Sequence, residues 1–121
     1  MSERDHREIL EGGWLLSGSE PDGMTVRLVF GETELARAYL GLTVGRHPAL
    51  CERTLAHDSV SRRHFRIGIA EGKLFVEDLN SLNGTFVDDR ELPPFQPTPL
   101  LPGQAIQAGR VNLAISRLDN R

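Results

Sequence analysis

Cysteine, long apolar runs and surplus positive charge are all scarce in this sequence of 121 residues. Its single cysteine, Cys51, excludes an intrachain disulfide and any zinc site built from several cysteines. No run approaches the roughly 18 apolar residues of a transmembrane helix, and no apolar stretch of signal-peptide length follows the charged N-terminus. We therefore expect a cytoplasmic protein that makes no contact with a membrane.

The charge balance and the missing catalytic motifs exclude further classes. A net charge of −3 argues against a general nucleic-acid binder, which usually carries a basic face. Ser61 and His64 lie close in sequence, but a nucleophilic serine needs an aligned base and an oxyanion site, and no Gly-x-Ser-x-Gly elbow is present. The histidines and Cys51 match no zinc spacing. We expect no enzyme, no cofactor and no metal.

What the sequence does contain is apolar alternation with a period of two, which is typical of β-strands. Glycine, proline and asparagine turn signals separate many short strands, and this arrangement predicts an all-β sandwich or barrel. The alternating segments are 26–30, 42–44, 65–69, 73–79, 85–87, 106–108 and 111–115.

The two ends of the chain differ from this pattern. Residues 1–24 are polar and contain several glycines, so we expect an N-terminal extension that is partly ordered at most, with Trp14 packed on the domain. Residues 25–118 form the predicted domain, and residues 119–121 form a C-terminal tail. The charged stretch 32–37 is expected to be a solvated turn.

Three loops between the predicted strands carry unusual chemistry: Gly45-Arg46, the stretch 61–64 and the stretch 80–84. Together they offer arginines, a serine hydroxyl and an asparagine carboxamide. An arginine fork can bond two phosphate oxygens at once, and turn N–H groups can bond the remaining ones. An asparagine beside them can bond a peptide main chain with both its donor and its acceptor. These groups predict recognition of a phosphorylated side chain.

The order and spacing of Gly45-Arg46, Ser61-Arg62-x-His64 and Asn83-Gly84 resemble the signature of the forkhead-associated (FHA) family. The stretches 60–65 and 76–87 and the late Pro102-Gly103 turn are similar as well, so the resemblance covers about residues 25–118. It implies an FHA-like (SMAD/FHA) β-sandwich of about eleven short strands, with binding loops at one end. It also implies a ligand, a peptide that contains phosphothreonine.

The resemblance further implies roles for individual residues. Those expected to bind the phosphopeptide are Arg46, Ser61 and Arg62 at the phosphate, Asn83 at the peptide main chain, and Leu82 through its backbone N–H. Those expected to shape the loops are Gly45, His64 and Gly84. Leu82 departs from the threonine that is common in the family, and the missing hydroxyl costs one hydrogen bond, about 1 kcal/mol.

The function that follows is a phosphothreonine-dependent protein-interaction module, a signalling adaptor downstream of Ser/Thr kinases. The expected partner is a phosphothreonine-containing protein, either a Ser/Thr kinase or its substrate, and not a nucleic acid. An alternative hypothesis is a phosphate-independent docking or scaffold module on the same fold, which Leu82 keeps open.

Overall fold

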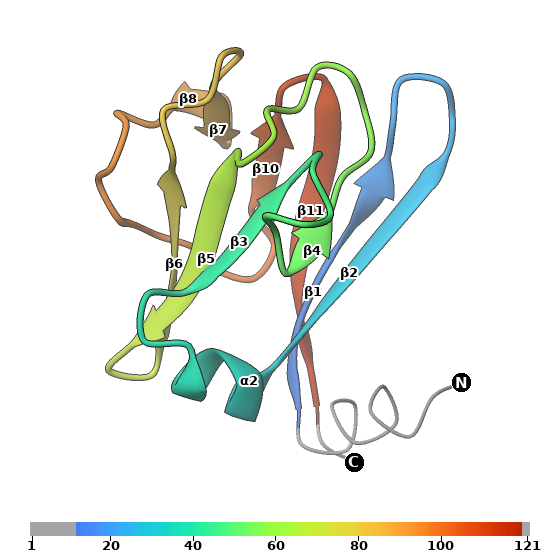
Figure 1. Cartoon of the computed structure of the whole chain (residues 1–121). Helices are drawn as coiled ribbons and strands as arrows, with labels where there is room; N and C mark the ends of the chain where they lie inside the picture. The colour runs from blue at the N-terminus through green and yellow to red at the C-terminus, as the bar shows by residue number, and fades with distance from the viewer. Residues whose placement is uncertain (1–11, 120–121) are drawn as a thin grey trace.

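The computed structural model describes residues 12–119, which form two β-sheets packed face to face (Figure 1). One sheet has six strands in the order β2-β1-β11-β10-β7-β8, and the other has five in the order β4-β3-β5-β6-β9. The strands are β1 (Gly13–Ser19), β2 (Thr25–Gly31), β3 (Leu42–Gly45), β4 (Arg53–Thr54), β5 (Phe65–Ala70), β6 (Lys73–Asp78), β7 (Thr85–Val87), β8 (Arg90–Glu91), β9 (Thr98–Pro99), β10 (Ala105–Ala108) and β11 (Val111–Leu118). The predicted all-β sandwich of about eleven strands is confirmed.

The core lies between the sheets and follows the predicted alternation. In β11, Val111, Leu113 and Ile115 are at most 2% exposed, whereas the residues between them face solvent. In β5 of the opposite sheet, Phe65 and Ile67 are fully buried. Each such side chain contributes about 1.5–3 kcal/mol when it leaves water. The period of two therefore reports which face of each strand meets the opposite sheet.

The sandwich begins earlier in the chain than the expected boundary at residue 25. β1 pairs antiparallel with β2 on one side and with β11 on the other, so it is an interior strand of its sheet. Trp14 is 5% exposed, as the predicted packing on the domain requires, and Leu16 is fully buried. Pairing on both sides and this buried face outweigh the weak strand preference of the glycines and serines in β1. The expectations for residues 1–11, and for 120 and 121, lie outside the described residues.

The stretch expected to be a solvated turn forms a short helix, α2 (Glu32–Arg37). Acidic residues in its first turn and Arg37 in its last turn suit the helix dipole. Leu35 is only 1% exposed because α2 packs against β1, β2 and β5. No helix within residues 12–119 is long and apolar enough to cross a membrane.

The loops that connect the sheets gather at two ends of the sandwich (Figure 1). The upper end in the figure carries the β3–β4, β4–β5, β6–β7 and β10–β11 connections together with the β1–β2 turn. α2 and the β5–β6 hairpin lie at the opposite end. The three loops that were singled out in the sequence therefore meet at one end of the fold.

Candidate phosphopeptide-binding site

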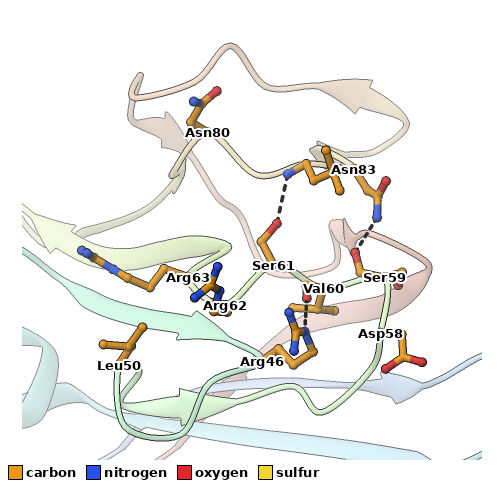
Figure 2. A pocket seen from close by; sticks show the side chains of 11 residues that line it. Arg46, Leu50, Asp58, Ser59, Val60, Ser61, Arg62, Arg63, Asn80 and Asn83 are labelled. Atoms are coloured by element: carbon orange, nitrogen blue, oxygen red, sulfur yellow. Dashed lines mark hydrogen bonds between the residues drawn. The ribbon is translucent and has the colours of Figure 1, made fainter.

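An open groove with a volume of about 560 Å³ lies among these loops (Figure 2). Its lining includes all five predicted binding residues, which are Arg46, Ser61, Arg62, Leu82 and Asn83. The structure thus brings together residues that are up to 37 positions apart in the chain, from Arg46 to Asn83. The predicted loop-shaping residues, Gly45, His64 and Gly84, are absent from the lining but contact the loops that form it.

Arg46 is held against the loop that carries Ser61. Its backbone N–H donates to Ser61 O at 2.9 Å, and its side-chain Nε–H donates to Val60 O at 2.9 Å. These two bonds fix the direction of the guanidinium, whose terminal nitrogens have no partner among residues 12–119. Arg46 is exposed, so its fork faces the solvent in the groove and can take an anionic ligand.

Gly45 permits the close approach of these two loops. A Cβ atom at this position would lie 2.3 Å from Arg62 O, which is far inside any van der Waals contact. Any side chain here would push β3 away from the β4–β5 loop and separate Arg46 from Ser61. The position of Gly45 supports the loop-shaping role expected for it.

His64 joins two of the loops from inside the core. Its Nδ1 accepts a hydrogen bond from the Ser61 N–H at 3.0 Å, so the proton sits on Nε2, which donates to Gly84 O at 2.8 Å. The ring is fully buried. Burial lowers the pKa of His64 below its ordinary value of 6.5, although the Gly84 carbonyl and Asp78 favour the charged form. Neutral His64 therefore ties the β4–β5 loop to the β6–β7 loop.

Ser61 and Leu82 contact each other across the groove. The Leu82 N–H donates to Ser61 Oγ at 3.0 Å, as Figure 2 shows. The expectation that this N–H is available to a ligand differs from the structure, in which Ser61 takes it up. The Ser61 hydroxyl keeps its own proton to donate. The Leu82 side chain is 89% exposed and stands at the rim of the groove.

Asn83 lies on the opposite side of Ser61 from Arg46 (Figure 2). Its Nδ2 donates to Ser59 O at 2.8 Å, and its Oδ1 has no partner within residues 12–119. The following residue, Gly84, has a φ of +87°, a conformation that glycine adopts without strain. The turn at Gly84 keeps Asn83 exposed while its neighbour's carbonyl reaches back to His64.

Asp78 organises the β6–β7 loop, a role that the sequence reasoning missed. It is 2% exposed, and its Oδ1 accepts hydrogen bonds from the hydroxyls of Ser81 at 2.6 Å and Thr85 at 2.7 Å. Its Oδ2 accepts from the N–H groups of Asn80 at 3.1 Å and Ser81 at 3.2 Å. The only signal in the sequence is that Asp78 stands two residues before Asn80 and three before Ser81, a spacing typical of Asx turns.

Arg62 and Arg63 add positive charge to the groove. Both side chains are exposed, and Asp58 is the one acidic side chain in the lining. The backbone carbonyl of Arg62 accepts from the His47 N–H at 3.2 Å and from the Cys51 thiol at 3.0 Å. Burial raises the pKa of Cys51, so the thiol keeps its proton and acts as a donor to this carbonyl.

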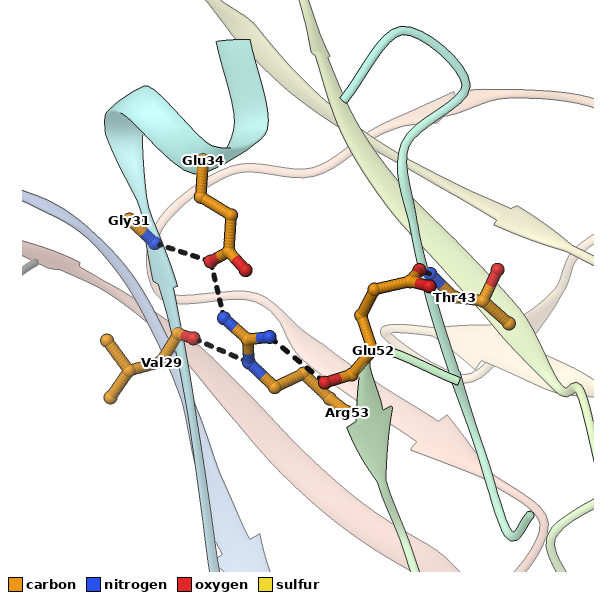
Figure 3. A network of polar contacts seen from close by, with 6 residues as sticks. All are labelled: Val29, Gly31, Glu34, Thr43, Glu52 and Arg53. Atoms are coloured by element: carbon orange, nitrogen blue, oxygen red, sulfur yellow. Dashed lines mark hydrogen bonds and ion pairs between the residues drawn. The ribbon is translucent and has the colours of Figure 1, made fainter. Parts of the chain in front are cut away.

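β4, which leads into the Ser61 loop, is anchored by Arg53 (Figure 3). Its guanidinium donates to Val29 O at 2.9 Å and to Glu52 O at 3.0 Å, and it forms an ion pair with Glu34 of α2. It also lies 5.2 Å from the centroid of the Phe30 ring. Arg53 therefore connects β4 to β2 in the opposite sheet and to α2, and it fixes the start of the loop.

The groove combines an oriented arginine fork, a hydroxyl donor, two further arginines and a free carboxamide oxygen. A phosphate monoester carries about −1.5 to −2 charges and three acceptor oxygens, which these donors match. Among residues 12–119, no three side chains of histidine, cysteine, aspartate or glutamate gather in a way that suits a metal ion. The arrangement is suited to binding an anion next to an extended peptide.

Comparisons with known proteins agree with this geometry. The family model described as FHA domain matches residues 42–109. The chain is 39% identical over 95 residues to the FHA domain-containing protein PS1 of Arabidopsis thaliana, covering 77% of this chain and 6% of that protein. It is 44% identical over 71 residues to the oxoglutarate dehydrogenase inhibitor of Corynebacterium efficiens, covering 59% and 47%. The chain therefore spans less than half the length of either relative.

The fold also resembles that of the N-terminal FHA domain of Rad53p from S. cerevisiae, a structure solved in complex with a phosphothreonine peptide. That comparison gives a TM-score of 0.69 at 22% identity and covers 86% of this chain and 92% of the other. At this identity the likeness speaks for the fold alone. Because the family model matches more than half of its residues, this chain belongs to the FHA domain family.

Proposed function

We propose that the chain is a phosphothreonine-dependent peptide-binding module that acts as a signalling adaptor downstream of Ser/Thr kinases. The FHA family is one of non-catalytic modules, and the chain is accordingly not an enzyme. The observation that carries the proposal is the fixed pair of Arg46 and Ser61. Two hydrogen bonds, to Ser61 O and Val60 O, aim the Arg46 fork into the same groove as the Ser61 hydroxyl.

In this proposal Arg46 and Ser61 bind the phosphate, and Arg62 adds a second guanidinium. Asn83 bonds the peptide main chain with the Oδ1 that has no partner within residues 12–119. Leu82 acts indirectly, because its N–H holds Ser61 Oγ in place at 3.0 Å. Gly45, His64 and Gly84 hold the loops without touching the ligand.

The partner class follows from the same chemistry. A phosphothreonine arises by the action of a Ser/Thr kinase, so the partner is an autophosphorylated kinase or one of its substrates, in the cytoplasm. FHA domains bind phosphothreonine peptides, and membership of this family supports this class of ligand. Hydrogen bonds to a charged group contribute about 1.5–3 kcal/mol each, so two or three of them separate phosphorylated from plain peptide by about a hundredfold or more.

Binding to an oriented phosphothreonine peptide library tests the proposal, with the unphosphorylated library as reference. We expect Arg46→Ala to weaken binding by more than about tenfold, because the phosphate loses the hydrogen bonds from both terminal nitrogens of the guanidinium. Arg46→Lys keeps the charge but not the fork, so its affinity is expected to fall between those of the wild type and Arg46→Ala. Arg90→Ala, an exposed arginine on β8 that is absent from the groove lining, is the matched control and leaves binding unchanged.

The alternative is phosphate-independent docking on the same fold, and one observation favours it: Leu82 is 89% exposed and offers a leucine where a hydroxyl would help hold phosphate. Equal affinity of the wild-type chain for plain and phosphorylated peptides, unchanged in a folded Arg46→Ala protein, would refute the proposal in favour of this alternative.

A further inference from the structure

A second cavity, of about 480 Å³, opens at the same end of the sandwich and is built by different elements. The end of β1 and the turn after it contribute Ser19, Glu20 and Pro21, and the β10–β11 hairpin contributes Gln107, Arg110 and Asn112. In Figure 1 both turns lie at the upper end, beside the β4–β5 loop. None of these residues belongs to the groove around Arg46.

Ser59 lies between this cavity and the groove. Its Oγ accepts a hydrogen bond from the Arg110 N–H at 2.8 Å, while its carbonyl accepts from Asn83 Nδ2 at 2.8 Å. The neighbouring turn is in contact as well, because the Gly109 N–H lies 3.2 Å from Gly84 O and donates to it. Ser59 therefore bridges Arg110 and Asn83, and Asn83 is the residue that binds the peptide main chain in the proposed function.

The chemistry of the second cavity suits an anion. Arg110 is exposed, and within residues 12–119 its guanidinium makes no hydrogen bond or ion pair. Gln107 donates its Nε2–H to Gly109 O at 2.9 Å, which holds the turn beneath Arg110. Ser19 and Asn112 supply further polar side chains in the lining. Glu20 is the one acidic residue there, and it opposes part of the charge of Arg110.

We infer that this second cavity binds an anionic side chain of the same ligand, a few residues from the phosphothreonine, and that Arg110 selects for it. The inference rests on the proposed function. A peptide in extended conformation advances about 3.3 Å per residue, so a chain held at Asn83 reaches the Arg110 cavity within a few residues. The anion is a carboxylate or a second phosphate, which share the chemistry that Arg110 recognises.

The experiment uses an alanine-flanked phosphothreonine peptide in which one glutamate is moved through each flanking position. The matched reference peptides carry glutamine at the same position, and dissociation constants are measured by fluorescence anisotropy. For the wild-type chain we expect glutamate at one or two positions to tighten binding by about two- to fivefold, the range of a partly exposed ion pair. Arg110→Ala removes this gain and leaves the glutamine peptides unchanged.

Of two further variants, one is expected to increase the gain from glutamate and the other to leave it unchanged. Glu20→Gln removes the competing carboxylate and is expected to increase the glutamate gain. Arg27→Ala removes an exposed arginine of β2 that lines neither cavity, and it leaves the gain intact.

Peptides with phosphoserine at the preferred position distinguish the two anions. A gain beyond that of glutamate that disappears in Arg110→Ala assigns a second phosphate, and an equal gain assigns a carboxylate.

The failures are distinguishable. If the glutamine peptides bind but glutamate gives no gain at any position, or if the gain survives Arg110→Ala, this inference is overturned while the proposed function stands. If no phosphothreonine peptide binds the folded wild-type chain, the proposed function fails and this inference fails with it.

Discussion

Replacing Asp78 with alanine tests whether the β6–β7 loop is held from inside the core. The carboxylate accepts four hydrogen bonds, from the hydroxyls of Ser81 and Thr85 and from the N–H groups of Asn80 and Ser81. Alanine leaves all four donors without this acceptor. Asn80 and Ser81 are the start of the loop that carries the groove residues, so both stability and binding are expected to respond.

The magnitude follows from the burial of each donor. Thr85 is fully buried, and an unsatisfied buried hydroxyl costs about 1–3 kcal/mol. The other three donors are partly buried and can regain water, so each loses a smaller amount, about 0.5–1.5 kcal/mol. We expect Asp78→Ala to lower the free energy of unfolding by about 3–5 kcal/mol. Asp78→Asn costs less, about 1–2 kcal/mol, because a carboxamide can offer its oxygen to the N–H groups and its amino group to the hydroxyls.

Urea unfolding followed by the fluorescence of Trp14, the single tryptophan, measures these differences. Asp89→Asn is the matched control, because Asp89 is exposed with a φ of +67° that asparagine tolerates well, and it should shift stability by less than about 0.5 kcal/mol. A cost for Asp78→Ala below about 1 kcal/mol, or an equal cost for alanine and asparagine, would refute the view that this carboxylate organises the loop.

Two other predictions concern groups that hold the site. Burial keeps the pKa of His64 below 6.5, so the unfolded chain takes up the extra proton first and the free energy of unfolding falls as the pH drops below about 6.5. Urea midpoints measured between pH 7.5 and 5 should therefore decline more steeply for the wild type than for His64→Gln. Equal slopes would contradict the view that His64 is buried in its neutral form. Arg53→Ala breaks the ion pair with Glu34, whose partners are only 16% and 17% exposed, and should lower the free energy of unfolding by about 2–4 kcal/mol. Glu32→Gln weakens the pair with Arg117, in which the side chains are 43% and 42% exposed, and should lower it by less than about 1 kcal/mol in the same assay.

The strands that the sequence predicted share one property, a side that must be buried. Val111, Leu113 and Ile115 alternate because one face of β11 meets the opposite sheet, and this alternation is visible without a structure. β4, β8 and β9 have only two residues each, which is too short for any period to appear. β1 was missed for another reason, since its glycines and serines look like turn residues and only pairing with two neighbours makes them a strand.

The proposed binding residues could be singled out in the sequence because their residue types match the chemistry of phosphate, but the contacts between them could not be predicted. Ser59 meets Arg110 across 51 positions, and Leu82 meets Ser61 across 21. Such contacts depend on the packing of two sheets and leave no local pattern. The expectation that the Leu82 N–H is available differed from the structure for this reason, since its partner lies in another loop.

The candidate site divides into residues that face the open groove and residues that hold the loops, and burial separates the two groups. Arg46, Leu82 and Asn83 are exposed and make few contacts with the core, whereas His64 and Asp78 are buried and fully hydrogen-bonded. Substitution of the exposed group should therefore change affinity with little effect on stability, and substitution of the buried pair should change both. In the proposed function, this separation would allow substitutions at the rim, such as at Leu82, to change ligand preference while the buried frame of the loops stays the same.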